Sequence, residues 1–323
     1  MAKHHRSGVL VAGSINSDLV ARVRVAPAAG ETVTGQQFAI FGGGKGANQA
    51  VAASRSGAVT TMLGAVGEDD FGRQRLADLQ DDHIDVTYVA RIAGASSGVA
   101  LIVVEESGQN RISYVPGATL DVTPRMAVDA ADRAAPSLIL ATLELPPETL
   151  RALFEVARRR GATVMVNASP EPAAGRQAME FADILVVNET EAAELLGESV
   201  DGPDWAGAAR RLLDQGPSSV VITLGAEGAL VAQSDTVQHL PAPTVNVVDT
   251  TGAGDACSGA MAAAIARGES VIEAARTGVV AGALSVMRAG AQPSIPHRTE
   301  IDDFIAKDGD GRSGRAQAAT VES

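Results

Sequence analysis

Aromatic side chains, cysteine and long apolar runs are all scarce in this chain of 323 residues. Only 3% of the residues are aromatic, so the chain lacks the rings on which proteins stack unpaired bases. The one cysteine, Cys257, excludes a disulfide within the chain and favours a reducing compartment. No apolar run approaches the roughly 20 residues that cross a bilayer. Residues 1–7 are basic and lack the apolar centre of a signal peptide, so we expect a cytoplasmic protein.

Positive charge is also in short supply. The chain has 26 Lys and Arg residues against 39 Asp and Glu residues, a net charge of −13. An acidic surface repels phosphate backbones and anionic lipid, so we expect neither nucleic acid nor membrane as a partner. A phosphate site in such a protein has to be built locally, from backbone N–H groups and a few cations.

The chain does have many apolar residues in a regular alternation of elements. The hydrophobic fraction is 46% and the mean hydropathy is +0.10. A strand at 9–12 is followed at once by a polar loop, and after about residue 122 short apolar runs alternate with segments of helical spacing. The runs are at 138–140, 164–166, 184–187 and 220–223, with helices at 149–159 and 204–213 among them. This alternation predicts an α/β fold, a three-layer sandwich with a central, mostly parallel sheet.

Two segments interrupt this rhythm with short alternating patterns, near 21–40 and 98–114, and helices at 47–55 and 71–81 lie between them. We predict that residues of approximately 19–41 and 97–115 form a small separate β-sheet, here called the lid. The main sheet, its helices and the lid are expected to form one domain over residues 8–306. Residues 307–323 are rich in Gly, Ser and charge, and are expected to be a disordered tail.

The strongest local signal is the run from Asp249 to Asp255, which reads DTTGAGD and is followed by apolar residues at helical spacing. Gly252 and Gly254 allow successive backbone N–H groups to point at one place, and a helix N-terminus attracts anions. Asp255 would lie beside a bound phosphoryl group and can accept the proton of an attacking hydroxyl, as phosphoryl transfer requires. The alternative is that Asp255 only caps the helix, a common role for Asp.

The run 249–255 resembles the C-terminal signature of the ribokinase-like (PfkB) carbohydrate kinases, and residues 43–50 (GGKGANQA) resemble the N-terminal one. Further matches follow in the family's order: 13–18 (GSINSD), Pro27 with 30–32 (GET), 188–191 (NETE), 223–228 (TLGAEG) and 290–294 (GAQPS). The likeness covers about residues 9–305. It implies the ribokinase-like fold and transfer of the γ-phosphoryl group of ATP to a small sugar. The expected reaction converts D-ribose, at its O5 hydroxyl, to D-ribose 5-phosphate.

The resemblance also implies roles for residues on the sugar side. Asp255 is implied as general base, and the N–H groups of Gly252, Ala253 and Gly254 as stabilisers of charge on the transferred group. Sugar binding is implied for Asn16, Ser17, Asp18, Gly43, Gly44, Lys45, Gly46, Ala47, Asn48, Glu144 and Asp255. Taken alone, Asn16 and Asp18 can equally be turn formers, and Glu144 can equally be a solvated surface charge.

On the nucleotide side, the resemblance implies ATP binding by Asn188, Thr223, Leu224, Gly225, Ala226, Glu227, Gly228, Gly254 and Val279. It also implies that Glu191 helps to hold Mg²⁺ through water, which suits an ion that keeps several of its waters. An acidic helix start is favourable by itself, however, and this alternative stays open.

The resemblance also implies a monovalent cation, K⁺, held between the run that begins at Asp249 and the distant segment 285–294. The implied ligands are Asp249, Thr251, Ser285, Arg288, Gly290 and Ser294, mostly through their carbonyl oxygens. The alternative is that Asp249 only caps its loop and pairs with Arg288.

These motifs identify the phosphate chemistry better than they identify the sugar. Deoxyribose, 2-keto-3-deoxygluconate and fructose stay open as acceptors, as does a non-catalytic sugar sensor of the same fold. A dinucleotide-binding oxidoreductase is disfavoured because no GxGxxG pattern follows the first strand. An apolar face on the lid predicts a homodimer formed through it.

Overall fold

The computed structural model describes residues 8–170, 172–197, 204–234 and 236–307. A helix over 298–307 ends this part, so Lys307, which was expected to begin the tail, is helical. Residues 308–323, the remainder of the expected tail, and residues 1–7 lie outside the described residues. No helix among those described is long and apolar enough to span a membrane.

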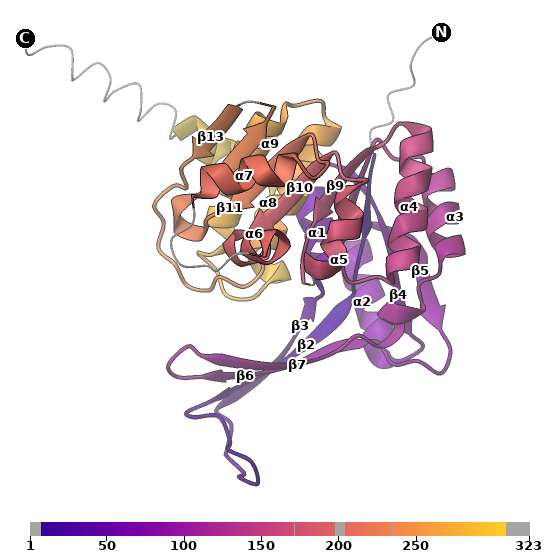
Figure 1. The fold of residues 1–323 in the computed structure, drawn as a ribbon. Helices are drawn as coiled ribbons and strands as arrows, with labels where there is room; N and C mark the ends of the chain where they lie inside the picture. The colour runs from indigo at the N-terminus through magenta and orange to yellow at the C-terminus, as the bar shows by residue number, and fades with distance from the viewer. Residues whose placement is uncertain (1–7, 171, 198–203, 235, 308–323) are drawn as a thin grey trace, which may run out of the picture.

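A nine-stranded sheet forms the centre of the molecule (Figure 1). In spatial order its strands are β13 (Thr236–Leu240), β12 (Ala229–Gln233), β11 (Ser219–Thr223), β10 (Ile184–Asn188), β9 (Thr163–Asn167), β8 (Leu138–Thr142), β1 (Gly8–Ala12), β4 (Val59–Gly67) and β5 (Asp85–Ile92). Neighbouring strands run parallel from β11 to β5, and only β12 and β13 pair antiparallel at the edge. The prediction of a central, mostly parallel sheet is confirmed.

Helices cover both faces of this sheet. One face carries α3 (Pro124–Ala134), α4 (Pro147–Arg160), α5 (Pro172–Met179), α6 (Glu189–Leu196) and α7 (Trp205–Leu213). The other carries α1 (Lys45–Arg55), α2 (Asp70–Asp81), α8 (Ala253–Ala266) and α9 (Val271–Ser285). Successive strand residues serve opposite faces: Leu10 and Ala12 join the first core, while Val9 and Val11 join the second. Cys257 is buried in α8, and burial raises the pKa of its thiol to about 12, as expected for a packing residue.

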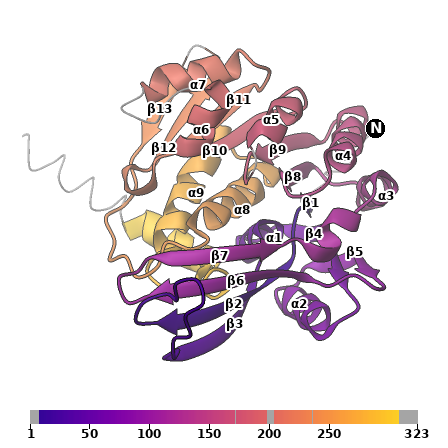
Figure 2. The ribbon, with the colours of Figure 1, turned by 60° about the horizontal axis from the view of Figure 1, so that its bottom comes forward.

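The lid is a separate four-stranded sheet that extends from one side of the main body (Figures 1 and 2). In spatial order its strands are β3 (Gln37–Gly43), β2 (Asn16–Val23), β6 (Gly98–Glu105) and β7 (Asn110–Val115). β2 is parallel to β6, and the two outer pairs are antiparallel. Because β2 begins at Asn16, Asn16 and Asp18 lie in an extended lid strand and are not turn formers, so that interpretation is wrong.

Candidate functional site

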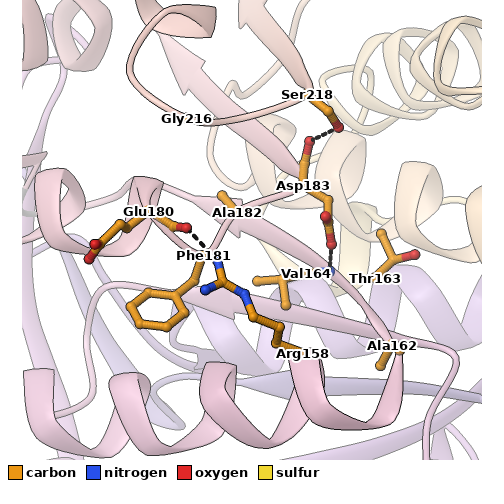
Figure 3. A pocket seen from close by; sticks show the side chains of 11 residues that line it. Arg158, Ala162, Thr163, Val164, Glu180, Phe181, Ala182, Asp183, Gly216 and Ser218 are labelled. Atoms are coloured by element: carbon orange, nitrogen blue, oxygen red, sulfur yellow. Dashed lines mark hydrogen bonds between the residues drawn. The ribbon is translucent and has the colours of Figure 1, made fainter.

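The candidate site lies at the carboxyl ends of the parallel strands, where open α/β sheets bind ligands. The loop after β1 leads to Asn16, the loop after β8 contains Glu144, and β9, β10 and β11 end at Asn167, Asn188 and Thr223. A cavity of about 390 Å³ lies at the opposite ends of β9 to β11 (Figure 3). There Arg158 lies over the ring of Phe181, 4.9 Å from its centre, and its guanidinium donates to the Glu180 carbonyl oxygen. These side chains already have partners, and the sequence motifs lie elsewhere.

The glycine run forms a tight turn that opens α8, as predicted. Gly252 has φ +78°, a left-handed conformation, and a Cβ atom there would lie 3.2 Å from Ala291. No side chain caps the helix. The Ala253 N–H donates to the Thr250 carbonyl at 3.3 Å, whereas the Gly254 and Asp255 N–H groups have no partner within the described residues. An open helix N-terminus with unpaired N–H groups is an anion site.

Asp255 is buried at this turn and is held by two amides from α1. Its Oδ2 accepts from Asn48 Nδ2 at 2.9 Å, and its Oδ1 accepts from Gln49 Nε2 at 2.9 Å. Burial raises the pKa of Asp255; the Lys45 charge and the two amides oppose this, and the Glu144 charge adds to it. Asp255 is not the side-chain cap of α8, so the simple capping interpretation is wrong.

Small residues bring α1 and α8 together closely enough for these bonds. A Cβ atom on Gly259, one turn after Asp255, would lie 2.4 Å from Ala52 Cβ and 2.4 Å from the Gln49 carbonyl oxygen. Only glycine fits this crossing. The contact of two backbones therefore fixes the distance between the carboxylate and its amide donors.

The glycines of the N-terminal signature serve the protein's own packing. A Cβ atom on Gly46 would lie 2.6 Å from Gly13, one on Gly43 would overlap the Asp18 carboxylate, and Gly44 has φ +90°. These glycines let the loop after β1 and the side chain of Asp18 approach the start of α1. Sugar binding by Gly43, Gly44 and Gly46 stays a prediction.

Asp18 lies on the lid face that looks toward Asp255. Burial raises its pKa to about 6, Arg75 of α2 lowers it, and the charge of Asp255 raises it further. Arg75 is itself buried: its Nη2 pairs with Asp78 at 2.7 Å, while its Nε and Nη1 have no partner among the described residues. The site thus holds one buried carboxylate, Asp255, and one half-buried carboxylate, Asp18, that repel each other.

Glu144 is half-buried and fixed by three donors. Its Oε2 accepts from Ser14 N at 3.0 Å and from Thr142 Oγ1 at 2.9 Å, and its Oε1 accepts from Ser14 Oγ at 2.7 Å. A carboxylate held by three donors is not a freely solvated charge, so that alternative is wrong. It ties the loop after β8 to the loop after β1.

The predicted nucleotide side lies at the ends of β10 and β11. Thr223 and Asn188 are neighbours across these strands, and the 3₁₀ turn η2 (Gly225–Glu227) exposes Gly225, Ala226 and Glu227. Leu224 and Gly228 are buried, and their backbones close the turn with a 2.8 Å bond. Val279 packs in the core of α9 and is only 8% exposed.

Asn188 and Glu191 form a reciprocal capping box at the start of α6. Asn188 Oδ1 accepts from Glu191 N at 2.8 Å, and Glu191 Oε2 accepts from Asn188 N at 2.9 Å. The alternative left open above, that Glu191 stabilises the start of a helix, is therefore present as this capping box. Among the described residues, no group of three or more His, Cys, Asp or Glu side chains could hold a metal ion alone.

Asp249 joins the loop before α8 to the distant segment after α9, as the sequence pairing predicted. Its Oδ1 accepts from Thr251 N at 2.9 Å and Oγ1 at 2.7 Å, and its Oδ2 accepts from Gly290 N at 2.9 Å. The N–H groups of Val248 and Asp249 both donate to Val286 O. Arg288 pairs with Glu300, so the expected alternative of an Asp249–Arg288 pair is wrong. The side chains of Ser285 and Ser294 donate to Gly282 O and Ala291 O.

Comparison with known proteins decides the family. The model of the pfkB family of carbohydrate kinases matches residues 6–298. This chain belongs to the pfkB carbohydrate kinase family. It is 36% identical to a ribokinase of Schizosaccharomyces pombe over 307 residues, covering 91% of this chain and 96% of that protein. It is also 36% identical to a deoxyribokinase of Salmonella typhi over 307 residues, covering 92% and 98%.

The solved structures agree with this family assignment. The structure of ribokinase from Thermotoga maritima has 32% identity and a TM-score of 0.83, covering 93% of this chain and 99% of that one. Arabidopsis thaliana ribokinase, solved with ribose and ATP, has 26% identity and a TM-score of 0.84, covering 92% and 97%. The predictions of the ribokinase-like fold and of an ATP-dependent sugar kinase are confirmed.

Several residues of this kinase site were not assigned from the sequence. Gln49 stands in the N-terminal signature, yet its contact with Asp255 depends on how α1 crosses α8. Asn167 receives the second bond of the Gln49 amide, at 2.8 Å, and Ser14 and Thr142 hold Glu144. The signal for Asn167, Ser14 and Thr142 was position, because each lies at or just after the carboxyl end of a parallel strand.

Proposed function

We propose that this chain phosphorylates D-ribose at O5 with ATP, giving D-ribose 5-phosphate and ADP, with Asp255 as general base. One observation carries the proposal: a buried carboxylate lies in the first turn of α8, which has no side-chain cap and whose Gly254 and Asp255 N–H groups have no partner among the described residues. The ribokinases among the relatives support ribose as the acceptor.

The reaction follows from this geometry. The sugar hydroxyl attacks the γ-phosphorus, a new O5–P bond forms, the bond to the β-phosphate bridging oxygen breaks, and ADP leaves. Asp255 takes the proton, and its raised pKa makes it a better base than an exposed Asp. The unpaired N–H groups of Gly254 and Asp255, with the Lys45 charge nearby, stabilise the charge on the transferred group.

The sugar would lie between the lid and the main sheet. Asp18, Asn16, Asn48 and Glu144 offer carboxylate and amide groups to its hydroxyls, and the lid covers them from water. Water is a competing nucleophile for the phosphoryl group, so this cover protects ATP from hydrolysis. The adenine nucleotide would approach along Thr223 and the exposed turn η2.

Two ions complete the proposal. Mg²⁺ would be held mainly by the phosphates and water, with Glu191 acting through water, and would neutralise phosphate charge. One carboxylate oxygen of Glu191 accepts the capping bond from Asn188 N, and the other oxygen can accept from a water bound to Mg²⁺. K⁺ would lie by Asp249 and would supply rigidity to the loop before Gly252. The carbonyls of Thr251, Arg288 and Gly290 accept no hydrogen bond within the described residues, which fits a cation that needs carbonyl ligands.

We also propose a homodimer formed through the lid. The sheet register places Leu19, Ile40 and Leu101 on one face, with Phe38 and Val115 on the same side. Phe38 is 62% exposed and Ile40 46% exposed, which is unusual for large apolar residues unless a partner covers them. Sedimentation of the wild type and of Phe38→Glu tests this: a wild type that sediments as a monomer at micromolar concentration counts against it.

Release of ADP, measured across a panel of sugars, tests the proposed reaction. The panel contains D-ribose, 2-deoxy-D-ribose, fructose and 2-keto-3-deoxygluconate, because a deoxyribokinase is as similar to this chain as the ribokinases are. We expect the largest kcat/KM with D-ribose and a product phosphorylated at C5. A larger kcat/KM with 2-deoxyribose would change the proposed acceptor sugar but not the proposed chemistry. Ribose binding without ADP release would favour a sugar sensor.

A further inference from the structure

The lid carries a phenol hydroxyl to which no sequence motif assigns a role. Tyr114 lies in β7 and pairs with Ala100 of β6, which in turn pairs with Asp18 of β2. Residues that are directly opposite in neighbouring strands project from the same face of a sheet. Tyr114 therefore lies on the face of the lid that carries Asp18, the face turned toward the candidate site.

Polar groups from four elements surround this hydroxyl. Burial raises the pKa of Tyr114 and the Glu144 charge raises it further, whereas the nearby polar side chains of Asn16, Thr119 and Ser14 lower it. Thr119 lies in the 3₁₀ turn η1 (Gly117–Asp121), which follows β7 directly. The hydroxyl of Tyr114 is thus within reach of the same cluster that holds Glu144.

Two buried atoms in this cluster lack partners in the described part of the chain. They are Asn16 Oδ1, in a residue 5% exposed, and Thr119 Oγ1, in a residue with no exposed surface. A buried polar atom without a partner destabilises the fold, so it calls for an explanation. A ligand hydroxyl explains both, since it can donate to the amide oxygen and accept from a phenol or threonine hydroxyl.

We propose that Tyr114, with Thr119 beside it, is a specificity-determining residue that binds one secondary hydroxyl of the acceptor sugar. This sugar hydroxyl donates to Asn16 Oδ1 and accepts from the Tyr114 hydroxyl. A site built in this way favours the sugar that carries the hydroxyl over the analogue that lacks it, because the analogue leaves the buried groups unpaired. This inference rests on the proposed function and extends it to the choice among closely related pentoses.

The test combines one variant with a set of sugars that each lack one hydroxyl. Tyr114→Phe removes only the phenol oxygen and keeps the ring. The substrates are D-ribose, its 2-deoxy and 3-deoxy analogues, and 1,4-anhydroribitol, which lacks the anomeric hydroxyl. We expect kcat/KM for ribose to fall by about tenfold on the loss of this hydrogen bond, mainly through KM. We expect a single analogue to escape this loss, and that analogue identifies the hydroxyl that Tyr114 contacts.

Two controls separate recognition from a general disturbance. Tyr88→Phe makes the same chemical change in β5 of the main sheet, outside the lid, and should leave kcat/KM for all four sugars unchanged. Calorimetry of ribose binding without ATP should show the same loss for Tyr114→Phe as kcat/KM does. An equal loss with all four sugars, or no loss with ribose, overturns the proposal. A wild type that phosphorylates none of the four sugars would instead overturn the proposed function.

Thr119→Val provides a second, independent measurement. It removes a buried hydroxyl that has no protein partner, so the variant should be at least as stable as the wild type in thermal unfolding, while ribose affinity falls several-fold. A less stable variant with unchanged ribose affinity would show that the hydroxyl serves the fold, and would overturn the role given to Thr119.

Discussion

Two regions of the site treat their carboxylates in opposite ways. Around Asp249, burial acts to raise the pKa, but hydrogen bonds from Gly290 and Thr251 outweigh it and the net shift is downward. On the sugar side, burial dominates and the pKa of both Asp18 and Asp255 is raised. Asp18 and Asp255 act on each other through their charges, whereas Asp249 is surrounded by enough donors to hold its charge.

The difference separates a structural role from a reactive one. A carboxylate saturated by backbone donors has nothing left to gain from a proton and is suited to fixing a loop. A buried carboxylate with few donors holds its proton more readily and binds strongly to any new donor, such as a sugar hydroxyl. Changes at the two kinds of carboxylate should therefore have effects of different size and on different quantities.

The largest effect is expected at Asp255. Asp255→Asn keeps the size of the side chain but removes the proton acceptor, so kcat should fall by at least about 10², the lower bound for a general base. Steady-state ADP release measures this. Asp249→Asn is the matched comparison and should lower kcat far less. A folded Asp255→Asn protein with nearly normal kcat would remove the general-base assignment.

Asp18 should act on sugar binding, not on the chemical step. Asp18→Ala removes a charged acceptor from a desolvated site and should weaken ribose binding by roughly 2–4 kcal/mol. The affinity for ATP should change little, because Asp18 lies on the lid. Calorimetry with each ligand separates the two; unchanged ribose affinity would show that Asp18 does not touch the sugar.

The same residue should cost stability at neutral pH. The pKa of Asp18 is about 6 in the folded protein against an ordinary value of 3.8, so its contribution to stability is fully present below pH 3.8. That contribution is lost as the pH rises through about 6. Asp18→Asn should therefore stabilise the protein at pH 7.5, by about 3 kcal/mol, and have little effect near pH 4. Urea unfolding at the two pH values measures this, and equal effects at both would contradict the assignment.

The sequence predicted the main sheet and the reaction, but the partners of the carboxylates required the folded structure. The alternation of apolar runs after residue 122 located the strands, because each run is buried on both faces. Asp18 could not be placed in the same way, because the chain leaves the main sheet at the end of β1 and begins β2 only three residues later. β2 then pairs with β6, about 80 positions later. The contact of Gln49 with Asp255 and the place of Tyr114 depend on helix crossing and sheet register, which no local pattern encodes.

The smallest expected effect tests the other side of the comparison, the saturated carboxylate. Asp249 fixes Thr251 and Gly290, and so sets the backbone that leads to the left-handed turn at Gly252. If K⁺ adds to this fixation, ADP release should rise several-fold when a bulky organic cation is replaced by K⁺ at constant ionic strength, because the N–H groups are then oriented before the phosphoryl group arrives. Asp249→Ala should lose the response to K⁺ while keeping ribose affinity, since Asp249 does not face the sugar. Arg288→Ala is the matched control: it breaks the pair with Glu300 but keeps the Arg288 carbonyl, so the response to K⁺ should survive. Equal rates in K⁺ and in the organic cation would show that the protein's own hydrogen bonds around Asp249 suffice to hold the loop.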